Sequence, residues 1–105
     1  MTRMSEENVQ LARMLDAVSD PVRMRIVFFL VEQGRKNVGD IARDFTISRP
    51  AISHHLKVLK DSGVVESEKL GQEVFYWINT RQVVNSLRAL ADRIERIPCS
   101  ANVQG

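Results

Sequence analysis

The stretch "SRPAISHHLKVLKDSGVV", from Ser48 to Val65, decides the fold of this chain. Ser48 is a residue type that caps helix N-termini, and Pro50 fits the first turn of a helix. Buried positions are expected where apolar residues recur at helical spacing, at Ile52, Leu56 and Leu59. Gly63 is typical of a C-terminal stop, because glycine readily adopts the left-handed conformation. The stretch therefore predicts an amphipathic helix over residues 48–62.

The segments on either side complete a pattern around this helix. A short helix is expected to start near Val38 and to bury Ile41, Ala42 and Phe45, and "TIS" then forms a three-residue turn. After Gly63, "VVESEK" and "VFYWI" predict two strands, with the glycine of "LGQE" in the turn between them. Two helices joined by a tight turn form a helix-turn-helix over residues 38–62. The hairpin at residues 64–78 makes it a winged variant.

Three further helices are expected outside this unit. One spans residues 5–18 and starts at Ser5, and a second follows Asp20, which looks like an N-cap, and ends at Gly34. A last helix, capped by Asn79 or Thr80, runs over residues 80–97 until Pro98 stops it. "RKN" at residues 35–37 is interpreted as a polar connector, and residues 98–105 as a loose tail. The sequence thus predicts one mainly α domain over residues 1–105, with about five helices and a small β-hairpin as the wing.

Composition is that of an ordinary soluble protein. The 105 residues favour a single domain, with 44% hydrophobic and 27% charged residues. The net charge of +2 and the pI of about 9.0 are compatible with a nucleic-acid partner. The start of the chain has no apolar signal-peptide core, and the longest apolar run, "IVFFLV", is too short to span a bilayer. We expect a cytoplasmic protein with no membrane partner.

The outward face of the 48–62 helix suggests contact with double-stranded DNA. An α-helix fits the major groove, and its first turns direct side chains at base edges. We predict DNA contacts from this helix and from the wing, at Ser48, Arg49, Pro50, Ser53, His54, Lys57, Lys69 and Gln72. The alternative for this face alone is a solvated surface helix. The tight turn, the serine cap, the glycine stop and the hairpin that follows favour DNA.

The segment from about Leu15 to Asn79 resembles the ArsR/SmtB family of winged helix-turn-helix repressors. "SDPVRMRIV" together with "ISRPAISHHLKVLKDSGVV" carries the resemblance. It implies a homodimeric repressor that binds an operator and leaves when a signal arrives. It also implies that Ser53 and His54 lie on the DNA-facing side of the recognition helix. The wing departs from the family pattern, because Gln72 follows Gly71 where relatives often have arginine, and Lys69 is the only nearby cation.

The metal sites of such relatives need cysteine or histidine ligands that this chain lacks at the matching positions. A thiolate site needs cysteines in the helix before the recognition helix, and "NVGDIARDF" has none. A site on the last helix needs histidine and carboxylate, and that helix has no histidine. The adjacent His54 and His55 point about 100° apart on a helix, which disfavours binding of one ion by both. We therefore expect no metal and no cofactor, and we interpret His55 as half-buried with one satisfied nitrogen.

Cys99, the only cysteine, is a candidate redox-sensing residue. It follows the last helix, near where two partner helices are expected to meet, so that oxidation of its thiolate or a disulfide between subunits would act as a signal. The alternative is an exposed thiol without a role. A redox-responsive repressor that uses Cys99 therefore stays open, and the sequence identifies no inducer.

The last helix carries a coiled-coil-like seam. Its apolar residues recur at spacings of 4, 3, 4 and 3. Together with the first helix it predicts a homodimer interface formed by Leu11, Leu15, Val83, Leu87, Leu90, Ile94 and Ile97. Packing on its own domain is the alternative, but the other helices already fill that core. A twofold dimer would place two recognition helices about one DNA turn apart and predicts a palindromic operator.

An enzyme is not expected. The sequence has no nucleophile–base pair and no glycine-rich phosphate loop. A winged-helix module that binds other proteins and no specific DNA remains an alternative, against which Arg49, Lys57 and Lys69 argue modestly.

Overall fold

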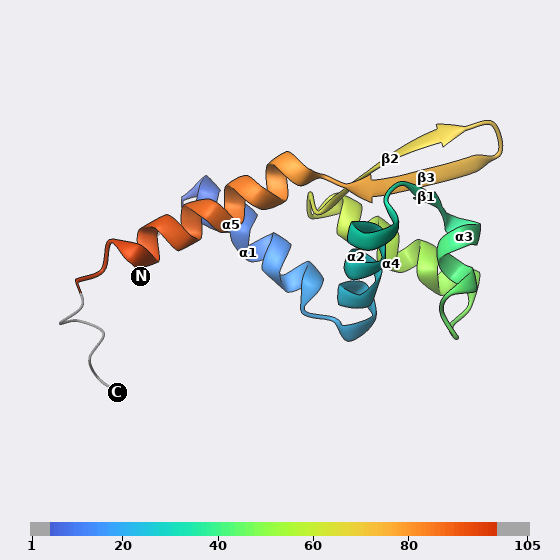
Figure 1. The fold of residues 1–105 in the computed structure, drawn as a ribbon, viewed down its shortest axis with the longest axis horizontal. Helices are drawn as coiled ribbons and strands as arrows, with labels where there is room; N and C mark the ends of the chain where they lie inside the picture. The colour runs from blue at the N-terminus through green and yellow to red at the C-terminus, as the bar shows by residue number, and fades with distance from the viewer. Residues whose placement is uncertain (1–4, 99–105) are drawn as a thin grey trace.

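The structure, a computed structural model, describes residues 5–98. A mainly helical body carries a small sheet whose hairpin projects from one end (Figure 1). The elements of the described part are α1 (Glu6–Val18), α2 (Pro21–Gln33), β1 (Lys36–Asn37), α3 (Val38–Arg43), α4 (Arg49–Asp61), β2 (Val65–Leu70), β3 (Glu73–Ile78) and α5 (Thr80–Glu95). The predicted fold class, a winged helix-turn-helix, is confirmed. The last helix ends at Glu95, two residues before the predicted end.

Short polar side chains cap the long helices, as the sequence predicted. The backbone N–H groups of Asn8, Arg23, Ala51 and Gln82 donate to the side chains of Ser5, Asp20, Ser48 and Asn79 at 3.1, 3.0, 3.3 and 3.3 Å. The bond from the Arg23 N–H is also the main reason why the pKa of Asp20 lies below its usual value. Each cap satisfies a donor that the helix itself leaves unpaired.

The prediction that residues 35–37 form only a polar connector is wrong. Lys36 and Asn37 form the short strand β1, which pairs antiparallel with Tyr76 and Phe75 of β3. The sheet therefore has three strands in the order β1-β3-β2. A two-residue strand has no periodicity of its own, so its pairing depends on β3 being brought alongside it.

The core lies between α1–α4 and the inner face of the sheet. Ile52, Leu56 and Leu59 are fully buried, which confirms the stripe predicted for α4. They pack with side chains from the other elements, mainly Met14, Ala17, Ile26, Leu30, Ile41, Val64 and Val65. α5 contributes no buried residue to this cluster. No helix of the described part combines the length and apolar character needed to cross a membrane.

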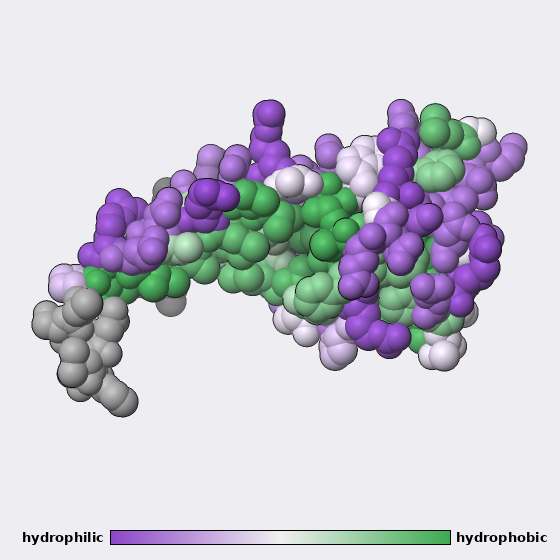
Figure 2. Space-filling model, viewed as in Figure 1, coloured by the Kyte–Doolittle hydropathy of each residue, from purple (hydrophilic) through white to green (hydrophobic). Residues whose placement is uncertain are grey.

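The single chain is elongated. α5 leaves the body and runs beside α1, and the described residues measure 54 × 27 × 25 Å (Figure 1). Their radius of gyration is 16.5 Å, whereas a compact domain of this length has about 13 Å. Figure 2 shows a hydrophobic band that runs from the core along α1 and α5. The large apolar side chains exposed on these two helices and just after α5 are Val9, Leu15, Val84, Leu87, Ile94 and Ile97.

Candidate nucleic-acid interface

The predicted DNA-contacting residues of α4 share one face of that helix. Arg49, Pro50, His54 and Lys57 are exposed, and Ser53 is half-buried. The opposite face is the fully buried stripe, so the helix is held from behind while its polar side stays in water. Ser48 lies just before the helix, where its hydroxyl accepts from the N–H of Ala51. The local sequence thus fixes both the start of the helix and the side that it exposes.

The cations of this face are only weakly engaged. The Lys57 ammonium lies 3.8 Å from the Asp61 carboxylate, and both side chains are largely exposed. An exposed pair of this kind contributes at most about 1 kcal/mol, so Lys57 can exchange it for a phosphate. The Arg49 guanidinium lies beside Gly39 of α3, where a Cβ would come within 3.6 Å of its Nη1. This distance is an ordinary van der Waals contact, so the Arg49 side chain lies against the start of α3.

The two adjacent histidines have different surroundings. His54 is exposed, whereas His55 is half-buried with its Nδ1 3.4 Å from Nη1 of Arg23. Arg23 is itself fixed, since its Nε donates to the carbonyl of Ala17 at 2.6 Å. The half-buried position predicted for His55, with one partnered nitrogen, is confirmed. Only His54 belongs to the exposed face.

The wing has two unlike faces. Strand alternation places Lys69 on the side of Val65, which is buried against the core, and Lys69 and Gln72 are exposed near the turn at Gly71. Gly71 has a φ of +63°, a conformation that favours glycine. Lys69 thus gives this side of the wing an exposed cation near the turn.

The outer face of the sheet is acidic and aromatic. Arg35, at the edge of the sheet, forms an ion pair with Glu68, and its guanidinium lies 4.3 Å from the ring centre of Trp77. The indole N–H of Trp77 donates to Glu66 at 3.2 Å. Carboxylates on this face repel phosphates, so the face is unsuited to DNA. The sequence did not predict the contacts of Arg35 with Glu68 and Trp77, because they depend on the pairing of the strands.

The sequence also did not predict two contacts to the end of α4. Gln10 of α1 donates to the carbonyl of Ser62 at 3.0 Å, and Arg13 donates to the carbonyl of Asp61 at 3.0 Å. The partners are 52 and 48 residues apart, and no local signal predicts such a contact. Both residues belong to the helix that was assigned only to dimerisation.

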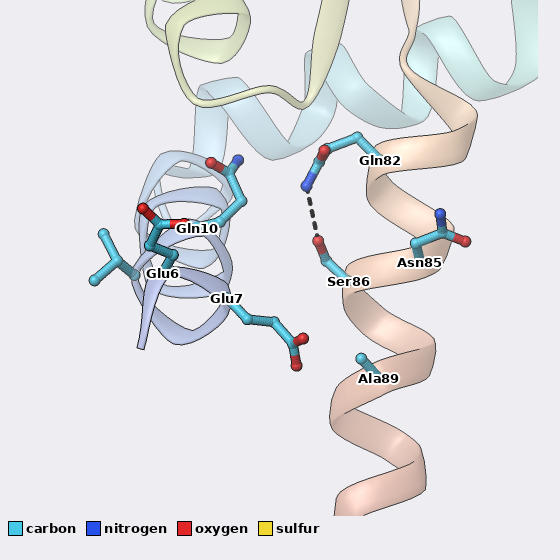
Figure 3. A pocket seen from close by; sticks show the side chains of 8 residues that line it. Glu6, Glu7, Gln10, Gln82, Asn85, Ser86 and Ala89 are labelled. Atoms are coloured by element: carbon cyan, nitrogen blue, oxygen red, sulfur yellow. Dashed lines mark hydrogen bonds between the residues drawn. The ribbon is translucent and has the colours of Figure 1, made fainter. Parts of the chain in front are cut away.

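A hollow of about 660 Å³ lies between α1 and α5. Figure 3 shows Glu6, Glu7 and Gln10 on one side of it and Gln82, Asn85, Ser86 and Ala89 on the other. The amide of Gln82 donates to the hydroxyl of Ser86 at 3.0 Å across one turn of α5. The hollow is polar near the end of α4 and carries no histidine or cysteine.

Within residues 5–98, no three histidine, cysteine or acidic side chains lie close enough together to hold a metal ion. The expectation that the protein binds no metal stays a prediction. Cys99 lies outside the described residues, so the redox hypothesis also stays a prediction.

The helix-turn-helix of α3 and α4, followed at once by the β2–β3 hairpin, defines a winged helix-turn-helix transcription regulator. Comparisons with known proteins give the family. Residues 20–67 match the profile described as "Bacterial regulatory protein, arsR family". The chain is 39% identical to the transcriptional repressor SdpR of Bacillus subtilis over 80 residues, which cover 76% of this chain and 88% of that protein. The chain therefore belongs to the ArsR family.

Other relatives support this family assignment. The biofilm growth-associated repressor of Xylella fastidiosa is 34% identical over 92 residues, which cover 86% of this chain and 80% of that protein. An ArsR-like transcriptional regulator from Rhodococcus sp. RHA1 superposes with a TM-score of 0.77, at 27% identity, over 95% of this chain and 97% of that one. A Mycobacterium bovis domain described as a homodimeric winged helix-turn-helix DNA-binding domain shares the fold, with a TM-score of 0.67 at 24% identity over 93% and 94% of the two chains.

Proposed function

We propose that this regulator is a homodimeric repressor that binds a palindromic operator in the cytoplasm and places α4 in the major groove. The observation that carries the proposal is the division of α4 into a fully buried face and an exposed polar face with Arg49, His54 and Lys57. Relatives that share most of this chain are named repressors. The partners are double-stranded DNA and a second copy of the chain.

The chemistry of each side chain suggests its part in binding. Arg49 suits a guanine edge or a phosphate, and Ser53 and His54 suit base edges or phosphates. Lys57, one turn further on, suits a phosphate. On the wing, Lys69 and Gln72 suit the DNA backbone. Base contacts discriminate by roughly 1–3 kcal/mol each, and phosphate contacts add salt-sensitive affinity.

The apolar band along α1 and α5 supports the dimer. No residue of α5 is buried within the described single chain, and Ile94 is 53% exposed. Leu11 and Val83 differ from the rest of the proposed interface, because they already pack on the core of their own chain. The proposed interface therefore depends chiefly on the exposed members, Leu15, Leu87, Ile94 and Ile97. Apolar side chains exposed over two adjacent helices are typical of a protein interface.

Selection of random DNA duplexes by the purified protein tests the proposal. We expect an enriched inverted repeat with half-site centres about one helical turn apart. Gel shifts with the selected duplex, at low and moderate salt, should show an affinity that falls steeply as salt rises. Arg49→Ala should weaken this binding, and Gln33→Ala, on the exposed end of α2, serves as the control. Failure to bind any duplex at low salt contradicts the proposal and favours a protein-interaction module.

A further inference from the structure

The C-terminal end of α4 is completed by side chains of another helix. The carbonyls of residues 58–60 accept from the backbone N–H groups of residues 62–64, at 3.0–3.1 Å. The next two carbonyls, of Asp61 and Ser62, accept from Arg13 and Gln10 of α1, each at 3.0 Å. The last carbonyls of a helix lack partners within the helix and must find them elsewhere. For α4, two of these hydrogen-bond partners come from side chains of α1.

Gly63, just after α4, allows Gln10 of α1 to approach the end of α4 closely. It has a φ of +85°, and a Cβ at this position would lie 3.0 Å from Nε2 of Gln10 and 3.4 Å from Cγ of Gln82. The end of α4 is thus flanked by one glutamine from α1 and another from α5. The amide of Gln10 is part-buried at this junction, whereas Arg13 lies at its exposed rim.

Two surface hollows flank this junction. The hollow between α1 and α5 is lined by Gln10 and Gln82 (Figure 3). A second hollow of about 220 Å³ lies on the other side and is lined by Arg13, Asp61 and Ser62. The core side of this end is closely packed, since Leu59, Val64 and Val65 are buried. The two hydrogen bonds hold the side of the α4 end that faces α1.

We infer that Gln10 is a positioning residue for DNA reading, which fixes the C-terminal end of α4 relative to the helices proposed to form the dimer. The inference rests on the proposed function. The residues proposed to contact bases begin at Arg49, and the 12 residues to Asp61 correspond to about 18 Å along the helix. A small rotation of α4 at Ser62 therefore moves the base-contacting side chains away from their places. Loss of this bond should lower the ratio of affinities for the selected and random duplexes. Its effect on the free energy of unfolding should be small.

Two pairs of variants test the inference. Gln10→Glu keeps the shape of the side chain and replaces the donor with a carboxylate that the Ser62 carbonyl repels, and Gln10→Met removes the donor without adding charge. Gln33→Glu and Gln33→Met make the same chemical changes on the exposed end of α2. The affinities for the selected duplex and for a random duplex of equal length are measured for every protein, with thermal unfolding and sedimentation.

We expect both Gln10 variants to lose about fivefold in the ratio of selected to random affinity, the effect of one hydrogen bond. Their dimerisation should stay unchanged, and the Gln33 variants should behave as wild type. A Gln10→Met protein that keeps the wild-type ratio overturns the inference. So does one that has lost its folded dimer, because Gln10 would then serve stability. If the wild-type protein itself binds no DNA, the proposed function fails first, and the two failures are thereby distinguished.

Discussion

Nη1 of Arg23 lies 3.4 Å from Nδ1 of His55, and this contact ties the recognition helix α4 to the start of α2. A guanidinium has no acceptor, so Arg23 donates and Nδ1 of His55 accepts. In the neutral imidazole, the proton then resides on Nε2. The pair explains why two neighbouring histidines on one helix have different surroundings, since His55 contacts Arg23 and His54 is exposed.

This difference predicts opposite phenotypes for the two histidines. His54→Ala should lower operator affinity roughly tenfold, the effect of one base contact, with an unchanged melting temperature. His55→Ala should destabilise the fold by about 1 kcal/mol, because it removes a part-buried contact and leaves Nη1 of Arg23 without the imidazole acceptor. Gel shifts and thermal unfolding of both variants check this. Equal loss of affinity in the two variants, with equal stability, would contradict it.

Lys57 is expected to act through the phosphate backbone. Lys57→Ala should weaken binding to operator and random DNA alike, and should reduce the slope of log affinity against log salt by about 0.9 per subunit. Arg81→Ala removes an exposed cation from the first turn of α5 and provides the matched control. Titrations at several salt concentrations give the slopes. A sequence-selective loss in Lys57→Ala would instead indicate a base contact.

Asp20 should make the stability of the protein depend on pH in the acidic range. Its pKa is lowered in the folded protein, chiefly by the Arg23 N–H, so the carboxylate stabilises the fold above its unfolded-state pKa of about 3.8. That contribution is lost as pH falls through the lower, folded-state pKa. Asp20→Ser retains a helix cap without a charge and should show a flatter melting temperature at low acidic pH. Parallel unfolding curves for the two proteins across this range would refute the assignment.

Ile94 tests the proposed dimer. Ile94→Asp places a charge in the exposed apolar band of α5 and should shift the protein toward monomer, with at least a tenfold rise in the dissociation constant of the dimer. Leu70→Asp makes a similar change at an exposed apolar residue of the wing, 51% exposed, and should leave the association unchanged. Sedimentation at several protein concentrations measures both. A dimer that tolerates Ile94→Asp would place the interface elsewhere.

Local rules of helix and turn formation made most of the fold predictable. The caps at Ser48 and Asp20, the stop at Gly63 and the buried stripe of α4 each depend on residues within one or two turns, so the sequence alone determined them. The exposed face that carries Arg49, His54 and Lys57 follows from the same periodicity. A winged helix-turn-helix with a polar recognition face was therefore predictable.

Only the tertiary structure decided the contacts between residues far apart in the chain. Strand β1 exists because β3 lies beside it, and Arg35 reaches Trp77 and Glu68 only across the assembled sheet. The bonds from Gln10 and Arg13 to the end of α4 span about half of the chain. Such pairs have no periodicity or local motif, because they depend on how completed helices pack. The sequence determined which face of α4 is polar and exposed, and the packing decided which residues hold that face in place.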